Sequence, residues 1–270
     1  MSVKPSATLP GSRSRRGVLA PSCGTYSVAG VHEGIVNLSA HDEAGHYLVS
    51  VISDPVHWTE LAILVRPDHP WWGPHRSAGD LVVLDELGAL PAPAPQPVLG
   101  GERAPIPAAV VEAARDALLR DYRANGFVAL LDPEAPRDDP FVRRAAGLLQ
   151  NAPGRTVSSI ISLIGLGIGF TPAGDDFISG VLLAQTLLTG APPSESDRSA
   201  IFSRLSGTTA GGSSLLLVAA AGFPPAYQLA LVDTLREGAV AQAIDTARRH
   251  GHSSGLDALS GLLWRLGEPQ

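Results

Sequence analysis

Two segments of this chain carry the same spacing of one aspartate, one serine and two glycines. They read TPAGDDFISGVLL (residues 171–183) and HSSGLDALSGLL (residues 252–263), and both fit the pattern G-x-D-x-[I/L]-S-G. Asp176 and Asp257 each fall in the first turn of an expected apolar helix. A carboxylate there complements the helix dipole, but it costs free energy when the turn is buried. Two such turns in one chain predict two walls of one site.

The second glycine of each segment, Gly180 or Gly261, follows its aspartate by four residues. Residues four apart lie on the same face of a helix. We therefore expect the two helices to cross closely at these glycines and to bring their N-termini towards one cavity.

The run GLGIGFTPAGDDF (residues 165–177) combines a glycine loop with the start of a helix. Its alternating glycines permit positive φ, with Thr171 as the expected N-cap and Pro172 as the first helical residue. Backbone N–H groups at such a start can hold a phosphate or carboxylate and stabilise developing charge. A tight turn with ordinary capping is the alternative for the glycines alone. The candidate substrate-binding residues are Gly165, Gly167, Gly169, Thr171 and Gly174.

The adjacent aspartates of this run would repel a bare anion, so a positive group must mediate. A Mg²⁺ ion held by Asp175 and Asp176 would do so, as would the N–H groups of an amide, urea or carbamoyl ligand. Alternatively, one aspartate is a general base for a nucleophile bound beside the amides. The sequence leaves these possibilities open, with Asp175, Asp176 and Asp257 as candidate catalytic residues.

The loop before the second aspartate repeats this geometry and adds imidazoles. Ser253 or Ser254 is expected to cap the helix, and His250 and His252 lie just before them, available for proton transfer. We expect Ser253, Ser254 and Gly255 to bind substrate and His252 to act in catalysis. A capped helix without a catalytic role is the alternative.

A third polar loop, GTTAGGSS (residues 207–214), opens another apolar helix. Thr208 and Ser213 are candidate hydroxyl donors to the same ligand, and a simple helix cap explains the loop equally well.

Composition excludes several classes of function. The net charge of −6 argues against a nucleic-acid partner, which would need clustered lysines and arginines. No apolar run approaches the roughly 18 residues of a membrane span, and the N-terminus lacks the apolar core of an export signal. The single cysteine, Cys23, rules out an internal disulfide and is expected to be a small buried residue. These features predict a cytoplasmic protein.

The hydrophobic periodicity predicts an α+β chain in which a small antiparallel β-barrel or sandwich precedes a mainly helical domain. Residues 1–15 are expected to form a disordered tail, 16–90 the β-rich domain, 91–106 a proline-rich connector and 107–270 the site-bearing helical domain. The expected strands lie at residues 34–40, 47–53, 61–65 and 81–85. The expected helices lie at 107–125, 139–151, 155–164, 172–189, 196–206, 209–221, 225–236, 238–249 and 254–266.

These motifs resemble the AllH/YlbF family. The similarity covers GLGIGFTPAGDDFISG (residues 165–180), the segment 208–222 ending in AAAG, and GHSSGLDALSGLL (residues 251–263). The resemblance implies a subunit of oxamate carbamoyltransferase, which converts oxalurate and phosphate to oxamate and carbamoyl phosphate. It also implies partner subunits related to acyl-CoA synthetases. It assigns no catalytic residue.

Two other functions remain open from the sequence. TPAGDDFISG is similar to the T-G-A-G-D-x-F-x-x-G signature of ribokinase-like sugar kinases, in which Asp175 would be the base and residues 173–175 the anion hole. Against a kinase, Pro172 replaces a glycine and removes one N–H donor. The other possibility is a non-catalytic subunit that binds a metabolite or completes the active site of another chain.

Overall fold

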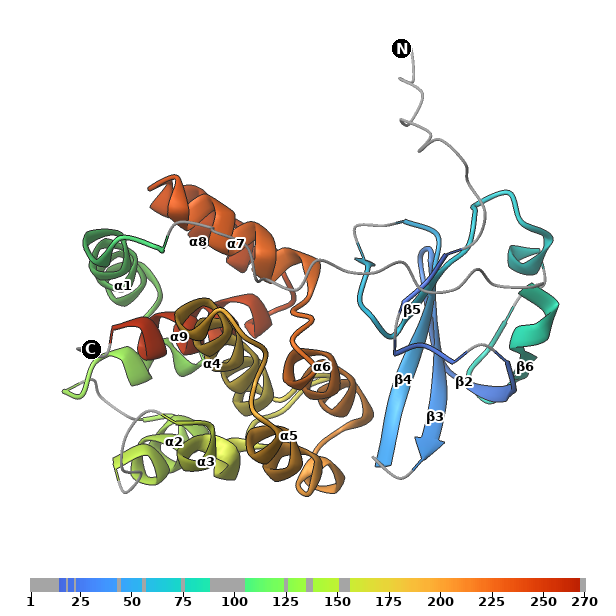
Figure 1. Ribbon diagram of the computed structural model, residues 1–270, viewed down its shortest axis with the longest axis horizontal. Helices are drawn as coiled ribbons and strands as arrows, with labels where there is room; N and C mark the ends of the chain where they lie inside the picture. Colours follow the sequence, from blue (N-terminus) through green and yellow to red (C-terminus); the bar gives the residue numbers. More distant parts are fainter. Residues whose placement is uncertain are drawn as a thin grey trace, which may run out of the picture. The chain divides into compact units, whose positions relative to one another are not determined.

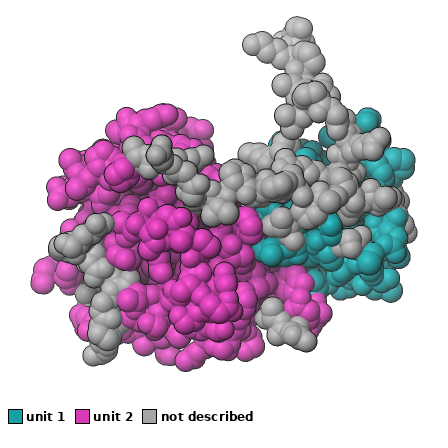
Figure 2. All heavy atoms as spheres, viewed as in Figure 1, with its two compact units in different colours: residues 1–40, 48–95 teal, residues 41–47, 96–270 magenta. Residues whose placement is uncertain are grey.

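The computed structural model describes residues 15–17, 19–21, 23–42, 45–54, 57–73, 76–87, 105–123, 126–134, 138–150 and 156–267. The chain divides into two compact units, residues 1–40 with 48–95 and residues 41–47 with 96–270 (Figure 2). Residues 1–14 of the expected tail and 91–104 of the expected connector lie outside the described residues. The α+β class is confirmed by a β-sheet that precedes a set of helices (Figure 1).

The described strands form one mostly antiparallel sheet with the order β1-β5-β4-β3-β2-β6. Their bounds are β1 Arg15–Arg16, β2 Thr25–His32, β3 Ile35–Asp42, β4 Gly45–Ile52, β5 Ala62–Leu64 and β6 Leu81–Val83. The exception to the antiparallel pairing is β4 with β5, in which Ser50 pairs with Ala62 in parallel. Leu38, Val49 and Ile63 are fully buried in this unit. Cys23 is exposed, so the prediction that Cys23 is buried is wrong.

The second unit contains the helices that carry the candidate site. Their bounds are α1 Ala108–Tyr122, α2 Pro140–Gln150, α3 Val157–Ile160, α4 Ala173–Thr189, α5 Glu195–Phe202, α6 Ala210–Ala220, α7 Ala226–Arg236, α8 Val240–Arg248 and α9 Ser254–Leu266. A 3₁₀ helix, η4 Gly126–Leu131, was not predicted and packs against α9. Among the described residues, no helix has both the length and the apolar character needed to cross a bilayer.

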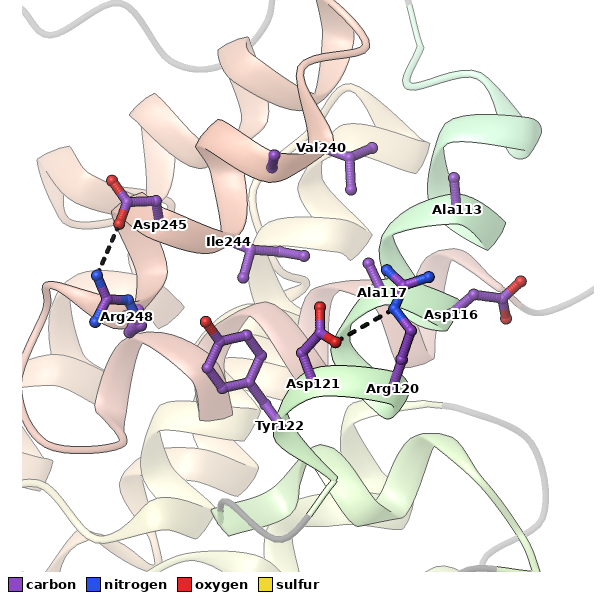
Figure 3. A pocket seen from close by; sticks show the side chains of 11 residues that line it. Ala113, Asp116, Ala117, Arg120, Asp121, Tyr122, Val240, Ile244, Asp245 and Arg248 are labelled. Carbon is purple, nitrogen blue, oxygen red and sulfur yellow. Dashed lines mark hydrogen bonds and ion pairs between the residues drawn. The ribbon is translucent and has the colours of Figure 1, made fainter.

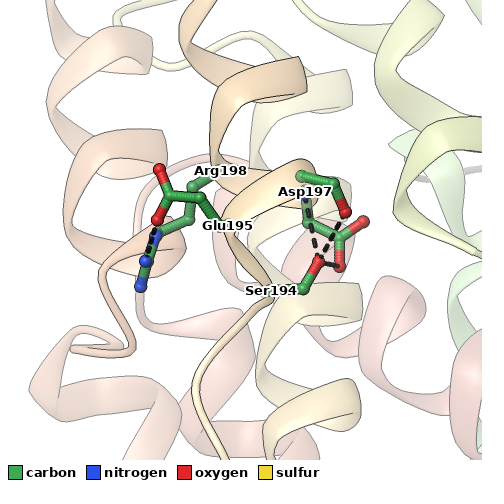
Figure 4. A network of polar contacts seen from close by, with 5 residues as sticks. Ser194, Glu195, Asp197 and Arg198 are labelled. Carbon is green, nitrogen blue, oxygen red and sulfur yellow. Dashed lines mark hydrogen bonds and ion pairs between the residues drawn. The ribbon is translucent and has the colours of Figure 1, made fainter.

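The start of α5 shows how local sequence ends one element and begins the next (Figure 4). Ser194 is the N-cap, and its hydroxyl oxygen accepts the Asp197 N–H at 3.1 Å. Glu195 and Arg198 form an ion pair on the same turn. Gln185 Nε2 of α4 donates to Asp197 Oδ2 at 3.1 Å. This cap therefore also ties α5 to α4, the central helix.

Candidate functional site

The helices α4 and α9 pack against each other through the second glycine of each repeated segment (Figure 1). A Cβ atom added at Gly180 would lie 1.9 Å from the Ala258 carbonyl oxygen, and one added at Gly261 would lie 1.9 Å from that of Phe177. Phe177 and Ala258 are equivalent positions, since each directly follows the aspartate of its segment. The contact is thus the same in both directions, as about a local two-fold axis. The predicted close crossing is confirmed.

The first glycine of each segment packs against the helix that precedes it. A Cβ atom at Gly174 would lie 2.0 Å from the Leu163 carbonyl oxygen, and one at Gly255 would lie 2.0 Å from that of Ala247. Only glycine permits backbone to approach so closely. The geometry therefore gives these two glycines a packing role, while the predicted contact with substrate stays a prediction.

The repeat buries two carboxylates in equivalent turns. Asp176 is 2% exposed and Asp257 is 0% exposed. Burial, followed by the negative charge of Asp257, raises the pKa of Asp176 well above its usual range. Burial also raises the pKa of Asp257 to about 7, against the opposing effects of the Phe127 N–H, which donates to its Oδ1 at 2.6 Å, and of the Ser253 hydroxyl. Both carboxyl groups therefore hold a proton to a higher pH than an exposed aspartate does.

A hydroxyl bridge joins the starts of the two helices. Thr171 Oγ1 donates to Asp176 Oδ2 at 2.9 Å and lies 3.0 Å from Ser254 Oγ. The expected meeting of the two helix starts is therefore observed at these side chains. The predicted N-cap role of Thr171 is wrong, because Pro172 is the N-cap of α4 and the threonine hydroxyl is committed to the carboxylate. Ser253 is the N-cap of α9 and makes no side-chain capping bond.

Asp175 is also fully buried, but both of its oxygens have donors. Its Oδ1 accepts the Gly165 N–H at 2.8 Å, and its Oδ2 accepts the Thr208 hydroxyl. Burial raises the pKa of Asp175 to about 6, against the opposing effects of these two hydrogen bonds, of which that from Thr208 is the larger. Asp175 thus fastens the glycine loop to the segment that leads into α6.

A methyl group at Gly212 should break this fastening. A Cβ atom there would lie 2.0 Å from Asp175 Oδ2 and 2.5 Å from Thr208 Oγ1. We expect Gly212→Ala to lower the free energy of unfolding by about 2 kcal/mol, because it overpacks the site and unpairs a buried carboxylate. Urea denaturation measures the change. Gly207→Ala is the control, because a Cβ atom added at Gly207 would have no neighbour within 4 Å. Equal stability of the two variants would contradict the expectation.

The glycine loop adopts the predicted backbone, but the amides of residues 174–176 at the start of α4 are already hydrogen-bonded. Gly165, Gly167 and Gly169 have φ values of +75°, +121° and +116°, which confirms the expected positive φ. The Gly174 N–H donates to Leu166 O at 2.8 Å, and the N–H groups of residues 175 and 176 both donate to Pro172 O. Two of the three amides in the kinase-like anion hole are therefore already used, while the predicted contact of the glycine loop with an anion stays a prediction.

The arrangement of donors does not favour Mg²⁺ at Asp175 and Asp176. Both oxygens of Asp175 accept hydrogen bonds from the protein. In the part of the chain that the structure describes, no group of three or more His, Cys, Asp or Glu side chains is placed to hold a metal ion. The alternative in which ligand N–H groups meet the carboxylates stays a prediction.

The remaining predicted residues do not all reach the acids. His252 is exposed, and neither a hydrogen bond nor an ion pair to the three aspartates is seen in the described residues. Ser213 is buried, but its hydroxyl donates to Leu205 O at 3.2 Å. The third polar loop proves to be a helix cap, in which Thr209 Oγ1 accepts the Gly212 N–H at 3.0 Å. Of that loop, Thr208 reaches the site, through Asp175.

Two residues beside the site were missed from the sequence, Tyr227 and Gln228 in the first turn of α7. Gln228 is 1% exposed, and its Nε2 donates to Ser179 Oγ at 2.7 Å and to the Tyr227 hydroxyl oxygen at 3.1 Å. Burial and then the charge of Asp176 raise the pKa of Tyr227. An amide side chain following Pro224 and Pro225, in a turn otherwise apolar, was the only sequence signal.

Two atoms in this region are buried without a hydrogen-bond partner: Asp257 Oδ2 and Gln228 Oε1. Buried polar atoms are almost always paired, so an unpaired one indicates a bound water or ligand. When Asp257 is ionised, its Oδ2 accepts hydrogen bonds and cannot donate them. In that state Asp257 Oδ2 calls for a donor.

Two open pockets lie elsewhere on the helical unit. One, of about 710 Å³, lies between α1 and α8, and its arginines pair with local aspartates, Arg120 with Asp121 and Arg248 with Asp245 (Figure 3). The other, of about 670 Å³, is lined by Arg143, Arg144, Ser162, Gly165 and neighbouring apolar residues. The second pocket borders the site of the three buried aspartates, which we call the acid site. The Gly165 N–H in the wall of this pocket donates to Asp175.

Comparison with known proteins covers the part of the chain that holds this site. Residues 163–266 match the family described as oxamate carbamoyltransferase subunit AllH. No curated protein and no solved structure matches the chain. The matched segment includes α4, α9, the Thr208 loop and the start of α7. The resemblance predicted from the sequence is therefore confirmed: over residues 163–266, this chain carries the pattern of the AllH subunit of oxamate carbamoyltransferase.

Proposed function

We propose that this chain is a carbamoyltransferase subunit in which the Asp176–Asp257 pair receives the carbamoyl group of a small carboxylate anion. The observation that carries the proposal is the buried, unpaired Oδ2 of Asp257. The NH₂ of a carbamoyl or ureido group supplies the donor that this oxygen lacks. The AllH match over the same residues supports oxamate, oxalurate and carbamoyl phosphate as the ligands.

A buried pair of carboxyl groups with raised pKa values can hold one proton and transfer it. In phosphorolysis of oxalurate, a phosphate oxygen attacks the ureido carbon, and the bond from that carbon to the oxamate nitrogen breaks. The protonated carboxyl gives its proton to the leaving nitrogen. The pair then regains a proton from the phosphate, and the products are carbamoyl phosphate and oxamate.

The anionic end of the ligand requires a positive neighbour. Arg143 and Arg144 line the pocket that borders Asp175 through Gly165, and they are the cationic groups that we propose for this role. The word subunit in the family description supports assembly with other chains, for which we propose partners related to acyl-CoA synthetases. We place the reaction in the cytoplasm, because a chain with one cysteine suits a reducing compartment.

The test is calorimetric titration of the purified chain with oxamate, oxalurate and carbamoyl phosphate. We expect Asp257→Asn and Asp176→Asn to weaken binding at least about tenfold, because each replaces a carboxylate acceptor by an amide that also carries donors. Asp233→Asn, at an exposed aspartate paired with Arg236, is the matched control and should bind as the wild type does. Melting curves establish that the variants are folded.

Unchanged affinity in Asp257→Asn would refute the role of the acid pair. If the wild-type chain binds none of the three compounds and gains no binding in the presence of its co-purified partner, the carbamoyl assignment is wrong.

A further inference from the structure

Tyr227 and Gln228, which we call the polar arm, extend from α7 to the site of Asp176 and Asp257 and lie outside the repeated segments. Gln228 Nε2 donates to Ser179 Oγ and to the Tyr227 hydroxyl oxygen. Ser179 belongs to the repeated pattern, so the arm is anchored on α4. Because the Tyr227 oxygen already accepts a hydrogen bond, its own proton is directed to a different acceptor.

One face of the Tyr227 ring stacks on His250. The ring centroids lie 3.5 Å apart, with 13° between the planes. The His250 carbonyl oxygen accepts the Gly255 N–H at 3.0 Å, which ties the stacked ring to the start of α9. The phenol is also within electrostatic range of Asp176 and Asp257, whose charges both raise its pKa after the effect of burial. The arm therefore lies close to the start of α9, the helix that carries Asp257.

We infer that Tyr227 and Gln228 orient a planar carbamoyl group, with the Tyr227 hydroxyl donating to its oxygen while Asp257 Oδ2 accepts from its NH₂. This inference rests on the proposed function and adds the residues that orient the ligand. A primary amide presents an acceptor and a donor side by side, whereas a carboxylate presents acceptors alone. A carboxylate in the same place would leave Asp257 Oδ2 without a donor and add like-charge repulsion. Asp257 thus selects an amide over a carboxylate, and the arm holds the amide oxygen in place.

The experiment compares the calorimetric dissociation constants of oxamate and oxalate, which differ by an amide in place of a carboxylate. The wild type should prefer oxamate. Tyr227→Phe removes the hydroxyl and keeps the ring, so it should weaken oxamate binding by about tenfold. Gln228→Met, which releases the hydroxyl but retains the tyrosine, should weaken oxamate binding in the same direction if Tyr227→Phe folds poorly. Tyr122→Phe, at the pocket between α1 and α8, is the matched control.

The outcomes separate the two proposals. If Tyr227→Phe and Gln228→Met bind oxamate as tightly as the wild type while Asp257→Asn loses the preference for oxamate over oxalate, the arm is overturned and the acid site stands. If the arm variants bind oxamate weakly while Asp257→Asn keeps the preference, the assigned acceptor is wrong and the arm stands. A wild-type chain that binds oxamate no better than oxalate overturns the assigned orientation of the carbamoyl group, even where Asp257→Asn still weakens binding.

Discussion

Gly261→Ala is expected to lower the free energy of unfolding by about 3 kcal/mol, the upper end for overpacking of a core. The added Cβ would lie 1.9 Å from the Phe177 carbonyl oxygen. That oxygen belongs to the backbone of α4 and cannot rotate away, so the two helices must separate. The gain from replacing a helical glycine by alanine, about 1 kcal/mol, offsets only part of this cost. Gly180→Ala should behave alike, because its contact with Ala258 is the equivalent one.

Gly147→Ala is the matched control for both variants. Gly147 also lies within a helix, α2, but a Cβ atom there has no neighbour within 4 Å. This variant should be more stable than the wild type by about 0.5 to 1 kcal/mol. Guanidinium denaturation of the three variants gives the comparison. If Gly261→Ala proves as stable as Gly147→Ala, the close crossing does not exist in solution.

The second large effect is the dependence of stability on pH. The pKa of Asp257 is about 7 and that of Asp175 about 6 in the folded chain, against about 4 for an unfolded aspartate. Between pH 4 and these values, the folded state binds more protons than the unfolded state, so stability falls as the pH rises through this window. At 1.36 kcal/mol per pH unit, Asp257 alone should make the protein about 3 kcal/mol more stable at pH 5 than at pH 8.

Asp257→Asn removes this titration and keeps an oxygen that can accept the Phe127 N–H. Urea denaturation at pH 5 and pH 8 should show a smaller difference for the variant, which should also exceed the wild type in stability at pH 8. The control is Asp245→Asn. Hydrogen bonding to Arg248, together with the charges of Arg248 and Arg249, holds the pKa of Asp245 below its usual value, so its titration lies below this window. A wild-type pH difference that persists in full in Asp257→Asn would show that Asp257 is ionised throughout.

In the β-rich unit, local pattern located strands but not their partners. The runs at residues 34–40, 47–53, 61–65 and 81–85 became β3 to β6, because alternating and β-branched side chains favour extended backbone. The parallel pairing of β4 with β5 could not be predicted, because strand register depends on neighbours that are distant in sequence. The element η4 was missed because its run GFVALL has no helical or strand period.

The sequence by itself determined the structure that forms within a single segment. The helix that carries Asp176 was expected at residues 172–189 and is α4, and the helix that carries Asp257 was expected and found at residues 254–266. The glycine spacing also predicted the crossing of α4 with α9, because the sequence shows where a helix face lacks a side chain.

The tertiary structure alone decided which groups surround the acids. Phe127 donates to Asp257 from 130 residues away, and Gln228 reaches Ser179 across 49 residues. Three of the amides expected to bind an anion instead donate to backbone carbonyls, as Gly174 does to Leu166. Burial, pKa and an unpaired oxygen depend on all the atoms packed around a group, and these are set only when distant segments meet.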